Sequence, residues 1–133
     1  LVVVLNLVIE FEKGNRFRAS DGKYTVRAGQ GEDSSDKDNM SPGRLFVSSL
    51  GMCAASYAVS FCRNRGLPHD DLVVEVEYQK GKSPSRVKSV EIKVRPPSEF
   101  PEKYNSALTR AAEKCYVKQS IAHGIDFNIS LED

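Results

Sequence analysis

Three cysteines are the residues of this chain best suited to chemistry: Cys53, Cys62 and Cys115. A cysteine thiolate is a nucleophile and a metal ligand, and its reactivity depends on its local pKa. The simpler alternative is that these cysteines only pack in a core, where this residue type is common. Cys62 follows Cys53 by about two and a half helical turns, so the two side chains would leave one helix on opposite sides. If two cysteines cooperate, Cys53 with Cys115 is therefore the geometrically open pair.

Other kinds of active site are poorly supported by the residue pattern. No Cys-x-x-Cys motif is present, and only His69 and His123, both beside predicted turns, could add ligands to a metal. The Gly-x-Ser-x-Gly elbow of serine hydrolases is absent, and so is a phosphate-binding glycine loop. We therefore expect neither a metal site nor a cofactor.

Composition indicates an ordinary globular protein. The 133 residues suggest a single domain over residues 1–133, with 40% hydrophobic and 28% charged residues. The 19 basic and 18 acidic residues leave a net charge of +1, so we expect no nucleic-acid partner and no membrane partner. An odd number of cysteines and the lack of a secretory signal favour the reducing cytoplasm, where free thiols are normal.

A long helix is expected in the middle of the chain. Ser41 and Pro42 are the favoured residues for an N-cap and a first helical position, and the helix can continue to Arg65, before Gly66. No charged residue occurs from Leu45 to Cys62, which predicts a helix buried on all sides. This stretch is nearly long enough to span a membrane, but its four serines and the amphipathic strands around it favour a central soluble helix. One small chain would struggle to cover such a helix, so we expect a homodimer.

Three strands are expected before this helix. Apolar residues alternate from Leu5 to Phe11, which predicts a half-buried strand. Two more short strands, residues 16–19 and 24–28, are joined by a hairpin turn at Asp21-Gly22. The polar, acidic stretch from Gly29 to Asn39 has no periodicity and is interpreted as a mobile loop.

The second half of the chain alternates strands and helices. A hairpin joins two strands with apolar faces, and a helix beginning at Pro101 has an apolar face that ends at Cys115. The chain should finish with a short helical turn and a last strand. The expected elements are strands 72–78 and 90–94 joined by residues 81–85, a helix over 101–115, a turn up to His123 and a strand over 125–131. The predicted fold class is α+β, a hairpin-rich antiparallel sheet packed on one long helix.

Three segments together resemble one family. Residues 41–53 are similar to the pattern Pro-x-x-Leu-Leu, small residues, then Cys, and residues 112–120 resemble Glu-Lys-Cys-Pro-Val. Residues 16–22 are similar to an N-terminal stretch that holds a functional arginine, with Arg16 the better match and Arg18 the second. These are motifs of the OsmC/Ohr family, named for osmotically inducible protein C and organic hydroperoxide resistance. The resemblance covers nearly the whole chain, in motif spacing and in element order.

The resemblance implies a fold, a partner and a reaction. Antiparallel sheets would surround a long central helix in an intertwined homodimer. Cys53 would attack an organic hydroperoxide and become a sulfenic acid, Cys115 would condense with it to a disulfide, and a dithiol reductant would reset the pair. Arg16 would hold both thiolate and peroxide, because a guanidinium is always charged and offers several donors. No cofactor is implied.

This sequence departs from the family pattern at three positions. Gly43 stands where hydroperoxidases place a glutamate that orients the arginine, Tyr116 replaces a proline and Lys118 replaces a common serine. Arg44 cannot easily substitute, because it precedes Cys53 by the same two and a half turns that separate Cys53 from Cys62. These departures keep an alternative open, a non-enzymatic homodimeric module that acts as a redox sensor or binds small apolar ligands.

Overall fold

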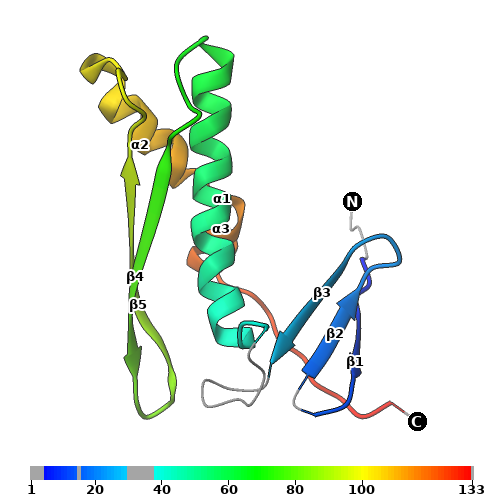
Figure 1. The fold of residues 1–133 in the computed structure, drawn as a ribbon. Coiled ribbons are helices and arrows are strands. Elements are labelled where there is room, and N and C mark those ends of the chain that lie inside the picture. Colours follow the sequence, from blue (N-terminus) through cyan, green and yellow to red (C-terminus); the bar gives the residue numbers. More distant parts are fainter. Residues whose placement is uncertain (1–4, 15, 30–37, 133) are drawn as a thin grey trace. The chain divides into compact units, whose positions relative to one another are not determined.

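Figure 1 shows the computed structural model of the chain, which describes residues 5–14, 16–29 and 38–132. It contains two antiparallel sheets and three α-helices, one of them long, so the predicted α+β class is confirmed. Contacts within the chain define two compact units, Leu1–Phe46 and Val47–Asp133. A single domain over residues 1–133 stays a prediction.

The N-terminal unit holds a three-stranded meander, β1 (Val8–Phe11), β2 (Arg16–Ser20) and β3 (Thr25–Gly29), in the order β1-β2-β3. Both pairings, β1 with β2 and β2 with β3, are antiparallel, and Phe11 lies opposite Phe17, with which it makes an edge-to-face ring contact. The three predicted strands are confirmed. The first begins three residues later than its alternating pattern suggested, because the pairing with β2 ends at Val8 opposite Ser20.

The predicted hairpin turn between β2 and β3 is confirmed. Asp21 Oδ1 accepts hydrogen bonds from the N–H groups of Lys23 at 2.9 Å and Tyr24 at 2.7 Å. Gly22 has φ +94°, a conformation that glycine adopts without the penalty of a side chain. The interpretation of residues 29–39 as a mobile loop falls mostly outside the described residues.

Helix α1 (Pro42–Asn64) begins where its sequence indicated and ends one residue before the predicted Arg65. Ser41 Oγ accepts a hydrogen bond from the N–H of Arg44 at 3.3 Å, which caps the first turn. Gly66, with φ +64°, follows the last turn. The helix buries one stripe, which consists of Val47, Leu50, Gly51, Ala54, Ala58, Phe61 and Cys62.

The expectation that α1 is buried all round is wrong for the single chain. Met52 is 71% exposed, Tyr57 is 37% exposed, and Ser56 and Ser60 are exposed as well. The physical reason is that the neighbouring elements of its own unit cover only the opposite stripe. By length and composition alone α1 could cross a membrane, but that packed stripe is typical of the core helix of a globular domain.

The hairpin of β4 (Val73–Gly81) and β5 (Arg86–Arg95) packs along α1. As predicted, Val74, Val76 and Tyr78 of β4 share one face, which is half-buried, and the charged residues between them are exposed. The hairpin comes close to the helix at Gly51, because a Cβ built there would lie 2.6 Å from Val76 Cγ2. A residue without a side chain on α1 therefore lets the hairpin approach the helix.

After the hairpin come a 3-10 turn (Glu102–Tyr104), α2 (Asn105–Glu113) and α3 (Tyr116–Ala122). The core of this unit joins α1 to α2. Its buried members are Ala58, Phe61, Cys62 and Leu108, with Leu67, Leu72, Val94, Phe100, Tyr104, Ala107 and Ala111 packed against them.

The predicted last strand is wrong for the single chain. Residues 124–132 have no regular secondary structure, although Ile125, Phe127, Ile129 and Leu131 alternate as expected. Phe127, Ile129 and Leu131 are 82%, 94% and 95% exposed. A strand needs a pairing edge, and neither described sheet contributes one to this segment. We call residues 124–132 the C-terminal segment.

Candidate active site

Cys115 is the most deeply buried of the three predicted site residues, Cys53, Cys115 and Arg16. It is 1% exposed and occupies the N-cap position of α3, with φ −48° and ψ 124°. The prediction that it ends the apolar face of the preceding helix is wrong, because α2 ends at Glu113 and the backbone turns at Lys114. The residue is buried as expected, but it begins the next helix.

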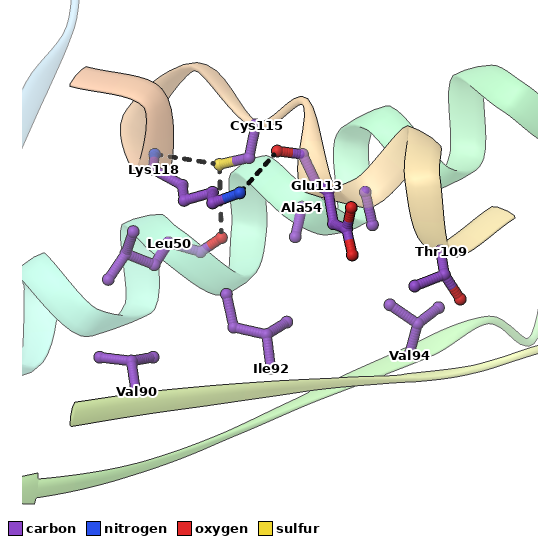
Figure 2. A pocket seen from close by; sticks show the side chains of 10 residues that line it. Leu50, Ala54, Val90, Ile92, Val94, Thr109, Glu113, Cys115 and Lys118 are labelled. Atoms are coloured by element: carbon purple, nitrogen blue, oxygen red, sulfur yellow. Dashed lines mark hydrogen bonds between the residues drawn. The ribbon is translucent and has the colours of Figure 1, made fainter. Parts of the chain in front are cut away.

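The thiol of Cys115 is held by the backbone on two sides (Figure 2). Its Sγ accepts a hydrogen bond from the N–H of Lys118 at 3.5 Å, and its S–H can donate to the carbonyl oxygen of Leu50 at 3.9 Å. The first contact caps α3 and the second joins α3 to α1. Neither partner could be found from residue types, because both are backbone groups.

Cys53 lies on α1 and is half-buried. Burial raises its pKa, but hydrogen bonds from the N–H of Val117, the thiol of Cys115 and the N–H of Tyr116 outweigh burial and hold the pKa below its ordinary value. All three donors stabilise the thiolate. The structure therefore brings Cys53 and Cys115 together, as the predicted pairing requires.

The pKa values of the other two thiols are shifted in the opposite direction, above the ordinary value. Burial raises the pKa of Cys115, and the neighbouring Cys53 raises it further, despite the hydrogen bond from Lys118. Burial alone raises the pKa of Cys62, which is fully enclosed in the core beside Leu108. Of the three cysteines, only Cys53 is both partly accessible and biased toward the thiolate.

Arg16 lies on β2 in the N-terminal unit, where its guanidinium is 3.8 Å from the carboxylate of Asp38. Arg18, the second arginine suggested by the sequence, pairs with Glu10 on β1. Both arginines are partly exposed. A contact between either guanidinium and Cys53 stays a prediction.

Gly43 lies in the first turn of α1, as the sequence indicated. A Cβ built at this position would meet no described heavy atom within 4 Å. The backbone there is helical, so a side chain at this position would be sterically tolerated.

A cavity of about 350 Å³ lies between α1, α2 and β5, and Cys115 contributes to its wall (Figure 2). Its lining is mostly apolar and consists of Leu50, Ala54, Val90, Ile92, Val94, Thr109, Ala112, Glu113, Cys115 and Lys118. Cys53 does not line it. The alternation of Val90, Ile92 and Val94 was visible in the sequence, but the cavity depends on where α2 ends. Within the described ranges, no group of three His, Cys, Asp or Glu side chains could hold a metal ion.

Residues 31–130 match the sequence profile of the family described as OsmC-like protein. None of the curated proteins matches the sequence significantly. Solved structures similar to this chain include a candidate osmotic stress induced and detoxification response protein from Psychrobacter arcticus, with 18% identity, TM-score 0.78 and coverage of 91% of this chain and 90% of the other. An OsmC-like protein from Mycoplasma pneumoniae has 11% identity, TM-score 0.74 and 92% coverage of both chains. The organic hydroperoxide resistance protein OhrB of Bacillus subtilis has 15% identity, TM-score 0.58 and covers 88% and 89%.

Proposed function

Because the chain belongs to the OsmC-like protein family, we propose that it serves in peroxide resistance as a thiol-dependent peroxidase that reduces organic hydroperoxides. The names of similar structures, among them an organic hydroperoxide resistance protein, support this role. The observation that carries the proposal is a pair of neighbouring thiols whose pKa values are shifted in opposite directions, that of Cys53 downward and that of Cys115 upward.

In the first step, the Cys53 thiolate attacks the distal oxygen of the hydroperoxide. The O–O bond breaks, Cys53 becomes a sulfenic acid, and the alkoxide takes up a proton and leaves as the alcohol. In the second step, the sulfur of Cys115 attacks the sulfenic sulfur, and water leaves with the thiol proton. A dithiol reductant then reduces the Cys53–Cys115 disulfide by exchange and becomes a disulfide itself.

The two thiols suit these two roles for different reasons. A peroxidatic cysteine must be ionised, and Cys53 has three hydrogen-bond donors directed at its sulfur. A resolving cysteine must be close and must not compete for peroxide, and Cys115 is 1% exposed with a raised pKa. Cys62 lies in the core and takes no part.

We further propose that Arg16 completes the site as an electrostatic partner of the thiolate and the peroxide. The assignment rests on the similarity of residues 16–22 to the family's arginine stretch. Gly43 removes the carboxylate that would orient this arginine, so we expect turnover to be slow compared with chains that carry the glutamate.

The proposed enzyme is a homodimer. The exposed apolar face of α1, represented by Met52 and Tyr57, supports this. So do the exposed side chains Phe127, Ile129 and Leu131 of the C-terminal segment. A second copy that covered both surfaces would remove a large apolar area from water.

The experiment is a peroxide-consumption assay with cumene hydroperoxide and with hydrogen peroxide, each with a dithiol reductant. Wild type should consume the organic substrate faster, Cys53→Ser should lose consumption, and Cys115→Ser should lose turnover after one cycle. Cys62→Ala is the matched control and should keep activity. A folded wild-type protein that consumes neither peroxide above the rate of Cys53→Ser would contradict the proposal.

A second function, that of a redox sensor, is favoured by a single observation, the glycine at position 43. Without the orienting carboxylate, the same thiol pair could be oxidised once and reset slowly, as in a redox sensor. The two functions differ in the assay, because a sensor forms the disulfide stoichiometrically but shows no sustained turnover with excess dithiol.

A further inference from the structure

The backbone N–H groups at the N-terminus of α3 have cysteine sulfur as their hydrogen-bond acceptor. The N–H of Lys118 donates to Cys115 Sγ at 3.5 Å, at the position where a serine, threonine or aspartate oxygen usually caps a helix. The N–H groups of Tyr116 and Val117 donate to the sulfur of Cys53. The first three amides of this helix therefore depend on the two thiols proposed to react.

Little else holds α3 in place. None of its seven residues is fully buried, and Val117, Gln119 and Ser120 are only half-buried. The side chains of Lys118 and Gln119 each donate to the carbonyl oxygen of Glu113 at 3.4 Å, on the exposed surface. A helix this short is marginal by itself, so its caps decide how often it opens.

Oxidation changes the acceptors. The Cys53 thiolate accepts charge-assisted hydrogen bonds from the N–H groups of Tyr116 and Val117, whereas the sulfur of a disulfide is neutral and a weak acceptor. A disulfide also has no S–H group, so the carbonyl oxygen of Leu50 has no thiol donor left within reach, whereas in the reduced state Cys115 Sγ can donate to it at 3.9 Å. The bond between the two sulfurs thus removes contacts at the start of α3 and between α3 and α1.

We propose that the Cys53–Cys115 disulfide uncaps α3, so that oxidation loosens this helix and the C-terminal segment that follows it. The inference rests on the proposed disulfide and goes beyond it, because it adds a conformational response. The consequence of this loosening is that a reductant can reach the disulfide. Cys115 is 1% exposed in the present state, and a dithiol reductant needs to approach the disulfide along the line of its sulfurs. Loosening α3 opens that approach only after the peroxide has reacted.

The test is amide hydrogen exchange followed by mass spectrometry on the whole protein, reduced and oxidised. Peptides over residues 116–122 should exchange at least about threefold faster in the oxidised wild type, as expected for loss of a cap. Peptides over α2 should not change. Diamide is used beside cumene hydroperoxide, so that the disulfide is formed even if the peroxide does not react, and peptide mapping identifies the bond in each sample.

Two variants separate the cap from the chemistry. Cys115→Ser keeps an N-cap acceptor but cannot form the disulfide, so treatment with either oxidant should leave exchange over residues 116–122 as in reduced wild type. Cys115→Ala lacks the cap and should exchange faster even when reduced. Equal protection of reduced and disulfide-bonded wild type would overturn the inference, and so would failure of diamide to form the bond. Lack of turnover with an intact exchange response would overturn only the proposed peroxidase.

Discussion

The thiol of Cys115 donates a hydrogen bond to the sulfur of Cys53, and this one contact moves the two pKa values apart. Burial acts first and raises both. At Cys53 the donors from Val117, Cys115 and Tyr116 outweigh burial, whereas at Cys115 the neighbouring Cys53 adds to burial. The Cys53 sulfur is thereby biased toward the thiolate and the Cys115 sulfur toward the thiol.

We expect Cys53 to be alkylated at a lower pH than Cys62. The lowered pKa of Cys53 gives a larger thiolate fraction at each pH below its ordinary value, and burial gives Cys62 a smaller one. The measurement is the rate of iodoacetamide alkylation against pH in variants that retain a single cysteine. The rate at Cys53 should reach its plateau at the lower pH. Equal rates at the two residues below neutral pH would contradict the assignment.

The same lowered pKa has a consequence for stability. Because the folded-state pKa of Cys53 lies below its unfolded value, the thiolate stabilises the fold fully above the unfolded pKa, and this contribution is lost as pH falls through the folded pKa. As the pH falls from above the unfolded pKa to below the folded pKa, reduced wild type should therefore lose more free energy of unfolding than Cys53→Ser. Denaturant titrations at several pH values measure this difference.

Mild peroxide treatment should give a Cys53–Cys115 disulfide and leave Cys62 free. Cys115 is the cysteine in hydrogen-bond contact with Cys53, while Cys62 is enclosed beside Leu108. Peptide mapping by mass spectrometry identifies the linkage. A dominant bond through Cys62, or only sulfonate at Cys53, would rule out the two-cysteine mechanism.

Gly51→Ala should destabilise the fold relative to Gly43→Ala. Both variants replace a helical glycine by a better helix former, but a Cβ at Gly51 would lie 2.6 Å from Val76 Cγ2, whereas at Gly43 no described atom lies within 4 Å. Overpacking of this kind costs about 1–3 kcal/mol. Urea unfolding of the two variants measures the difference, and equal midpoints would show that the hairpin can move away from α1 without cost.

The protein should be a homodimer at micromolar concentration. The surfaces that would be covered are the exposed face of α1, with Met52 71% exposed, and the C-terminal segment, with Leu131 95% exposed. Light scattering gives the mass, and Met52→Lys should shift the equilibrium toward single chains because it would place a charge in an apolar interface. A wild-type mass of one chain would exclude the dimer.

Local signals predicted most of the fold. Ser41 and Pro42 marked the start of α1, Asp21 and Gly22 marked a turn, and period-two alternation marked β4 and β5. Each of these depends on residues close in sequence. The strand predicted over residues 125–131 failed for the converse reason, because alternation shows that a segment can pair but not that its own chain offers an edge.

The site was predictable in part. The helical phase separated Cys53 from Cys62 and left Cys115 as the open partner, and the structure brings that pair together. The backbone groups that contact the two sulfurs could not be predicted in the same way. The N–H groups of Tyr116 and Val117 and the carbonyl oxygen of Leu50 carry no residue-type signal, and they meet the sulfurs only because α2 ends before Cys115.

The last prediction concerns Gly43→Glu, at one of the three positions where this chain departs from the family pattern. The substitution should not unfold the protein. It replaces a glycine in the first turn of α1, where the site is sterically open, and it places a negative charge at the positive end of the helix dipole, worth about 0.3–1 kcal/mol. Thermal unfolding should therefore occur at the wild-type temperature or above it.

If Arg16 acts on the Cys53 thiolate, the new carboxylate could orient its guanidinium by a bidentate pair, and turnover of organic hydroperoxides should rise. Arg16 now has the carboxylate of Asp38 at 3.8 Å, so the variant offers it a second anion. The measurement is turnover of wild type and Gly43→Glu, each with and without Arg16→Ala, and Gly43→Gln controls for the added side chain without its charge. A rise that needs both the charge and Arg16 supports the arginine assignment. Unchanged turnover in a folded Gly43→Glu protein would mean that this chain does not use an arginine held by a glutamate, because the missing carboxylate would have been restored without effect.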